Sequence, residues 1–176
     1  MSIRKWLGLE PEAAESSDTD TIRKVVAALD HLPPERGRYI AAFGYLLGRV
    51  AHADLHISAE ETAVMERIVV QHGKIPLDQA VIVVQMAKTN TQLLGGTENF
   101  LVTREFQRMV TRDELLVLLD CLFAVSAAED SISMAEDNEI RQIASELGLD
   151  HREFIQVRAA WKDRLAVLKG LPDHGR

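Results

Sequence analysis

Two short segments of the chain carry side chains whose types and spacing could hold a cation. The candidate ligands are Asp54, Glu61, Glu129, Asp130 and Glu136, with Glu60, His52 and His56 as second choices. Hard divalent cations such as Ca²⁺ take several oxygen ligands, which carboxylates supply. The histidines flank Asp54 in an H-x-D-x-H alternation, a pattern that a transition metal such as zinc could use.

The two segments are copies of one internal repeat. Residues 50–61 return without a gap as residues 125–136, each position 75 residues later, and the same offset still pairs Gly73 with Gly148. A repeat is the first feature to use in predicting a fold, because each copy is one structural unit. We therefore expect two similar helical units, which could bring the two acidic turns together around a pseudo-two-fold axis.

Part of each repeated motif has a structural explanation. Ser58 with Glu61, and Ser133 with Glu136, match the Ser-x-x-Glu capping box that starts a helix. Acids near a helix start are also favoured by the helix dipole. The acids before each serine have no such requirement, so the hypothesis of a cation site depends on them. Two interpretations stay open, namely acids that only cap helices and acids that also bind an ion.

Helical periodicity and helix caps predict an all-α fold, a compact bundle of about seven to eight helices made of two repeated three-helix units. The expected helices span residues 20–31, 34–53, 58–73, 76–93, 100–110, 115–128, 133–148 and 151–169. Thr111 and Asp150 are expected to cap two of them. The long apolar helices 34–53 and 115–128 should pack against each other.

The chain is expected to form one main domain. Residues 1–19 are predicted to be a flexible N-terminal segment and acidic linker, 20–170 the helical domain, and 171–176 a tail, with repeat one at about 34–93 and repeat two at about 111–169. Trp6 follows two cations near the N-terminus, and this segment could touch a membrane surface or a partner groove. A loosely docked terminus is the other interpretation.

Charge and cysteine content exclude several classes of protein. The formal charge of −7 argues against nucleic acid as a partner. Cys121 is the single cysteine and lies among leucines, which predicts a buried thiol and a reducing cytoplasm. The start of the chain shows no signal peptide, and its longest apolar run is too short to span a membrane. We expect a cytoplasmic protein and leave open a peripheral association with the inner membrane.

The sequence contains no motif for a catalytic centre. G-x-S-x-G, Walker and G-x-G-x-x-G strings are absent, and the twelfth residue counted from Asp54 is Met65 rather than the glutamate of an EF-hand. His72 aligns with Leu147 in the second repeat, which predicts a packing histidine. Asp120, in an otherwise apolar helix, is expected at a helix edge beside solvent. We therefore predict that the protein is not an enzyme.

The repeated motif resembles that of the TerB-like family, which is named for bacterial tellurite resistance. The residues that carry the resemblance are Ala53-Asp54-x-x-Ile57-Ser58-x-x-Glu61 and Ala128-Glu129-Asp130-x-Ile132-Ser133-x-x-Glu136. The resemblance implies internally duplicated helical bundles whose acidic turns chelate a divalent cation. The glycine that the family places after the acid is Leu55 in one copy and Ser131 in the other, which makes a left-handed turn more costly. One relative is a J-domain co-chaperone, but this chain lacks the His-Pro-Asp tripeptide.

The leading hypothesis is a non-enzymatic TerB-like module of a tellurite, stress or metal-ion response. It would bind protein partners, with membrane-associated ones and a homo-oligomer left open, and a divalent cation (Ca²⁺, Zn²⁺ or Mn²⁺) through the acidic turns. One alternative is an adaptor without a metal site, which would act through the surface around Trp161 or through the N-terminal segment. A metal-dependent hydrolase, which needs clustered acids in a deep pocket, is the third.

Overall fold

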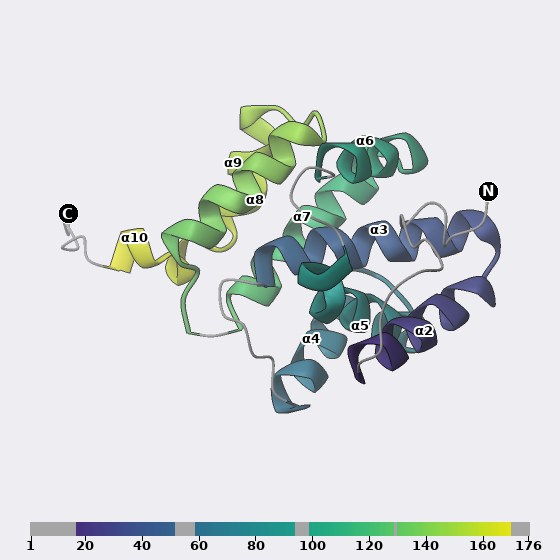
Figure 1. Ribbon diagram of the computed structural model, residues 1–176. Helices are drawn as coiled ribbons and strands as arrows, with labels where there is room; N and C mark the ends of the chain where they lie inside the picture. Colours follow the sequence, from purple (N-terminus) through teal and green to yellow (C-terminus); the bar gives the residue numbers. More distant parts are fainter. Residues whose placement is uncertain (1–16, 52–58, 94–98, 129, 170–176) are drawn as a thin grey trace, which may run out of the picture.

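The computed structural model of the protein describes residues 17–51, 59–93, 99–128 and 130–169 (Figure 1). These residues are mainly helical, and the predicted all-α fold is confirmed. The elements are α2 (Ser17–Asp30), α3 (Pro34–Ala51), α4 (Ala59–Gln71), α5 (Leu77–Leu93), α6 (Asn99–Met109), α7 (Arg112–Ser126), α8 (Met134–Glu146), α9 (His151–Ala159), the 3₁₀ turn η2 (Lys162–Arg164) and α10 (Ala166–Lys169). None of the described helices has the length and apolar character needed to cross a lipid bilayer.

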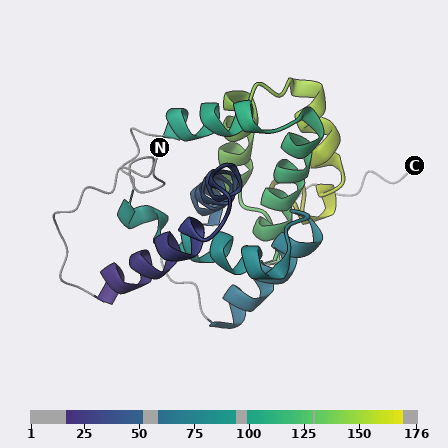
Figure 2. The same cartoon turned by 90° about the vertical axis from the view of Figure 1, so that its right-hand side faces the viewer.

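Helix α3 lies at the centre of the bundle. Figure 2 looks nearly along it and shows other helices around it; α3 contacts α2, α5, α6, α7 and α8. Its sequence explains this position, because apolar residues occur on all sides of the helix, and nearly every residue from Ile40 to Val50 is buried. The predicted contact between α3 and α7 is present, but α3 makes its largest interface with α5, a helix of its own repeat.

The predicted helix caps of the second repeat are present. Thr111, Ser133 and Asp150 each form a capping box with the glutamate three residues later. Ser133 N donates to Glu136 Oε2 at 2.7 Å, and Glu136 N donates to Ser133 Oγ at 3.2 Å. The matching box in the first repeat needs Ser58, which lies outside the described residues.

The two glycines paired by the repeat have different roles. Gly148 has a φ of +72° and ends α8 as predicted. In the first repeat, however, the left-handed residue is Lys74, with a φ of 55°, and not Gly73. Gly73 is required for space, because a Cβ there would lie 2.6 Å from Val69 O and 3.1 Å from Phe43 Cζ.

The predicted single helix over residues 151–169 is wrong, because α9 ends at Ala159. The chain then bends through η2, and Leu165 forms an isolated parallel bridge with Ile132. Ile132 N donates to Arg164 O at 2.7 Å, and Ala166 N donates to Ile132 O at 2.9 Å. This pairing with the α7–α8 connection buries Leu165 and satisfies backbone groups that a continuous helix would have bonded internally.

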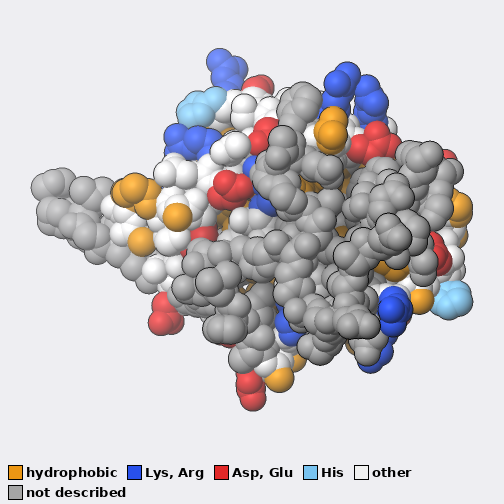
Figure 3. All heavy atoms as spheres, in the orientation of Figure 1, with side chains coloured by type: hydrophobic (Ala, Val, Ile, Leu, Met, Phe, Trp, Pro, Cys, Tyr) orange, Lys and Arg blue, Asp and Glu red, His pale blue; other side chains and the backbone are white. Residues whose placement is uncertain are grey.

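The remaining observations concern the buried cysteine, the surface charge and the start of α2. Cys121 is fully buried, as predicted, and burial raises the pKa of its thiol. On the face of the molecule shown in Figure 3, the described acidic and basic side chains are interspersed. Helix α2 begins at Ser17, three residues before the expected start at Asp20.

Candidate functional site

The structure describes half of the predicted cation ligands. Glu60, Glu61, Asp130 and Glu136 are described, whereas His52, Asp54, His56 and Glu129 lie outside the described residues. Glu60 and Glu61 begin α4, and Asp130 and Glu136 belong to the α7–α8 connection and the start of α8. Among the described residues no group of three or more acids, histidines or cysteines could hold a metal ion. A complete cation site would therefore need the ligands that are not described.

The acidic turn before α8 has two unusual features. Asp130 has a φ of +67°, a left-handed conformation that is uncommon outside glycine, although aspartate and asparagine adopt it more readily than other residues. Ser126, in the last turn of α7, is 3% exposed, and its Oγ has no hydrogen-bond partner among the described residues. A buried hydroxyl without a partner is costly. One oxygen of Glu136 is already occupied by the capping box.

A second group of polar side chains joins the turn after α4, helix α7 and the segment after α9. His72 Nδ1 lies 2.7 Å from Asp120 Oδ2, and Trp161 Nε1 donates to Asp120 Oδ1 at 2.9 Å. The rings of His72 and Trp161 lie 5.5 Å apart. The side chains of His72 and Asp120 are 34% and 36% exposed. Asp120 is therefore at a helix edge beside solvent, as predicted, but it also holds two aromatic rings in place.

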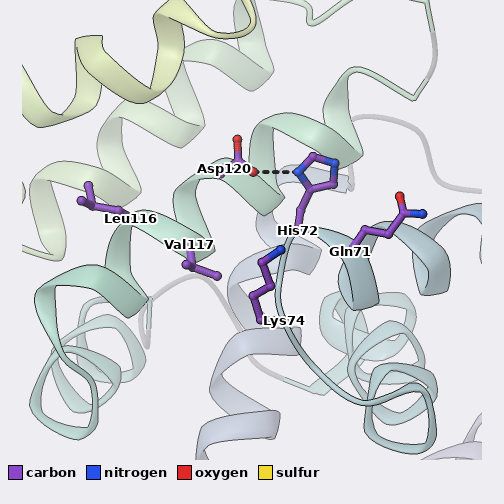
Figure 4. Close-up of a pocket in the computed structure, with 6 residues that line it drawn as sticks. All are labelled: Gln71, His72, Lys74, Leu116, Val117 and Asp120. Carbon is purple, nitrogen blue, oxygen red and sulfur yellow. Dashed lines mark hydrogen bonds and ion pairs between the residues drawn. The ribbon is translucent and has the colours of Figure 1, made fainter.

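This group forms one wall of an open cleft of about 440 Å³ (Figure 4). The lining residues are Gln71, His72, Lys74, Leu116, Val117 and Asp120. Each of them is exposed or half-buried. In Figure 4 the Lys74 side chain extends towards the His72–Asp120 pair.

Sequence reasoning considered His72 and Asp120 separately and missed their pairing. The two residues are 48 positions apart, and the repeat pairs His72 with Leu147, which carries no polar signal. The available signal was Asp120 itself, because an acid within an apolar helix usually has a partner. The role of Lys74 was not predicted, because the repeat pairs Gly73 with Gly148 and so placed the left-handed residue at Gly73.

The fold is an all-helical bundle, with an acidic residue, Asp130, in the connection before α8. A family model described as tellurite resistance protein TerB matches residues 39–159, which is more than half of the chain. The chain therefore belongs to the TerB family, as the repeated motif indicated. A comparison with curated proteins and one with solved structures gave no match.

Proposed function

We propose that this TerB-family chain is a non-catalytic module that binds protein partners in a response to tellurite, metal ions or a related stress, with a divalent cation at its acidic turns. Family membership supports the general part of the proposal. The same proposal places the module in the cytoplasm, where some of its partners could be membrane-associated and where it could self-associate.

The observation that supports a cation is the turn between α7 and α8. Asp130 keeps a left-handed backbone at a position where glycine would cost less, and strained residues of this kind cluster at functional sites. Within the part of the chain that the structure describes, Ser126 Oγ, four residues earlier, lacks a hydrogen-bond partner. The Asp130 carboxylate offers oxygen ligands, which suit Ca²⁺ or Mn²⁺ better than Zn²⁺.

Within this proposal the acids have separate roles. Asp130 would hold the ion, together with Asp54 and Glu129 from the undescribed parts of the turns. Glu136 and Glu61 would contribute less, because a capping-box glutamate binds its own helix start. A bound cation would neutralise several acids, which would change the charge of the surface that a partner recognises.

Calorimetric titration of the full chain with Ca²⁺, Mn²⁺ and Zn²⁺ tests the cation. Asp130→Asn removes the charge but keeps a residue suited to the left-handed turn, so loss of binding would not reflect misfolding. Asp30→Asn, an exposed acid at the end of α2, is the matched control. We expect saturable heat in the wild type and in Asp30→Asn, with affinity reduced at least about tenfold in Asp130→Asn. Absence of heat with all three ions would remove the cation from the proposal.

An adaptor without a metal site is the second candidate. The capping box of Ser133 and Glu136 favours it, because it accounts for two of the repeated residues without any ion. In this case Asp130→Asn would leave partner binding unchanged. The hydrolase alternative has less support, because the described residues hold no cluster of acids.

A further inference from the structure

The cleft beside α7 contains a histidine that is held in one tautomer. A carboxylate oxygen only accepts hydrogen bonds, so the 2.7 Å contact between Asp120 Oδ2 and His72 Nδ1 places a proton on Nδ1. The lone pair of a neutral ring is then on Nε2. Among the described residues Nε2 has no hydrogen-bond partner, and the side chain is about one-third exposed. The ring therefore presents a nucleophilic nitrogen to the solvent.

Asp120 is itself fixed in position. Its second oxygen, Oδ1, accepts the indole N–H of Trp161 at 2.9 Å, so the carboxylate cannot easily turn away from His72. A carboxylate on Nδ1 stabilises the positive charge that develops on the ring when Nε2 attacks an electrophile. The nucleophile lies in the turn directly after α4, the orienting acid lies on α7, and the tryptophan comes from the segment after α9.

Lys74 supplies the charge that would suit an anionic electrophile. It lines the same cleft, and its ammonium group extends towards the His72–Asp120 pair (Figure 4). Its φ of 55° is a conformation in which glycine or asparagine would be less strained. A lysine kept under strain beside a reactive histidine indicates a role for its charge.

We propose that His72 Nε2 accepts a phosphoryl group from a donor with a phosphorus–nitrogen bond, such as a phosphohistidine of a partner protein. The Nε2 lone pair forms a bond to phosphorus while the bond between phosphorus and the donor nitrogen breaks. That electron pair stays on the donor nitrogen, which takes a proton from solvent. The proton on Nδ1 remains hydrogen-bonded to Asp120, and Lys74 pairs with the phosphoryl oxygens.

The shape of the cleft fits a protein donor. Each of its six lining residues is exposed or half-buried, so a ring carried by another protein can reach Nε2. Leu116 and Val117 of α7 provide an apolar surface on which that ring can rest. The proposal does not depend on a cation at the acidic turns.

The experiment uses potassium phosphoramidate as the donor and the full chain in the presence of a chelator. Mass spectrometry at neutral to alkaline pH follows the acid-labile phosphoryl group on each histidine with time. His31 and His151 are exposed and serve as controls within the same molecule. We expect His72 to react about tenfold faster than either, although it is less exposed, because the Asp120 carboxylate stabilises the positive charge that develops on the ring in the transition state. Equal or slower reaction of His72 in the wild type would overturn the proposal.

Two substitutions test the roles of the neighbours. Asp120→Asn should slow His72 to the rate of the control histidines, and Lys74→Asn, which suits the left-handed backbone, should slow it several-fold. Lys24→Asn, an exposed lysine on α2, should change nothing. If Asp120→Asn does not fold, Trp161→Phe, which removes the donor to Oδ1, replaces it and should also slow His72. An unchanged rate on His72 in the folded Asp120 variant, or in its replacement, would contradict the proposed activation.

Discussion

Arg49, on the central helix α3, forms a two-pronged ion pair with Glu146 of α8. Arg49 Nη1 donates to Glu146 Oε2 at 2.7 Å, and Nη2 donates to Oε1 at 3.2 Å. Arg49 Nε also donates to Glu139 Oε1 at 2.8 Å, and Thr103 Oγ1 of α6 donates to Glu146 Oε2 at 2.8 Å. The Arg49 side chain is only 4% exposed. These bonds join α3 of the first repeat to α8 of the second, with α6 between them.

Replacing Arg49 should be among the most destabilising single changes on α3. Arg49→Met keeps the length of the side chain but leaves Glu146 and Glu139 without their cation. Loss of one partner of a buried ion pair costs about 3–5 kcal/mol, and we expect a loss near the lower limit because Glu139 is partly exposed. Urea unfolding followed by circular dichroism measures this loss in the free energy of unfolding. Arg104→Met, at an exposed position of α6, is the control and should lose less than about 1 kcal/mol.

Glu146 should also make the stability depend on pH. Burial raises the pKa of Glu146, but hydrogen bonds from Arg49, Thr103 and Gln142 outweigh it and hold the pKa below the usual value. Because the pKa is lowered in the folded state, the ionised Glu146 stabilises the fold at pH values above its unfolded pKa of about 4.3. This stabilising contribution is lost as the pH falls through the pKa of the folded state. The free energy of unfolding should therefore fall below about pH 5. At neutral pH Glu146→Gln should be less stable than the wild type, and the difference between them should shrink towards pH 3. A difference that stays constant from pH 7 to pH 3 would exclude this ion pair as its source.

The capping box before α8 separates stability from ion binding. Ser133→Ala removes the hydroxyl that accepts from Glu136 N, and loss of such a cap costs about 0.5–2 kcal/mol. Glu136→Gln should cost less, because glutamine also serves in a capping box. Thermal unfolding measures both. Ser133→Ala should leave any calorimetric signal with Ca²⁺ or Mn²⁺ unchanged; a signal that disappears with it would assign the cap to the ion site.

The features that could be predicted are those formed by residues close together in the sequence, and the ones that could not are formed by residues far apart. The caps at Thr111, Ser133 and Asp150 depend on residues three positions apart, so the sequence was sufficient to predict them. The ion pair of Arg49 with Glu146 joins residues 97 positions apart. Nothing in the periodicity of either helix indicates such a partner.

The break after α9 has the same origin. The apolar stripe over residues 151–169 is compatible with one helix, and no proline or glycine interrupts it before Gly170. The backbone leaves the helix because Ile132, in a different connection, takes up the hydrogen bonds of Arg164 and Ala166. The candidate cleft depends on this break, since it lets Trp161 reach Asp120. A tertiary interaction thus decided both the helix boundary and the site.

Substitution of the two paired glycines should show that one is needed for space and the other for backbone conformation. At Gly148, alanine would be strained by the φ of +72°, at about 1–2 kcal/mol, whereas asparagine tolerates this region and should recover part of the loss. The nearest atom there is the amide nitrogen of Gln107, which can move away. At Gly73 any Cβ meets the backbone oxygen of Val69 at 2.6 Å, so alanine and asparagine should both destabilise, by about 1–3 kcal/mol or more. Urea unfolding of the four variants decides the matter: recovery by asparagine at both positions would mean that Gly73 is required for its backbone conformation and not for the space beside Phe43.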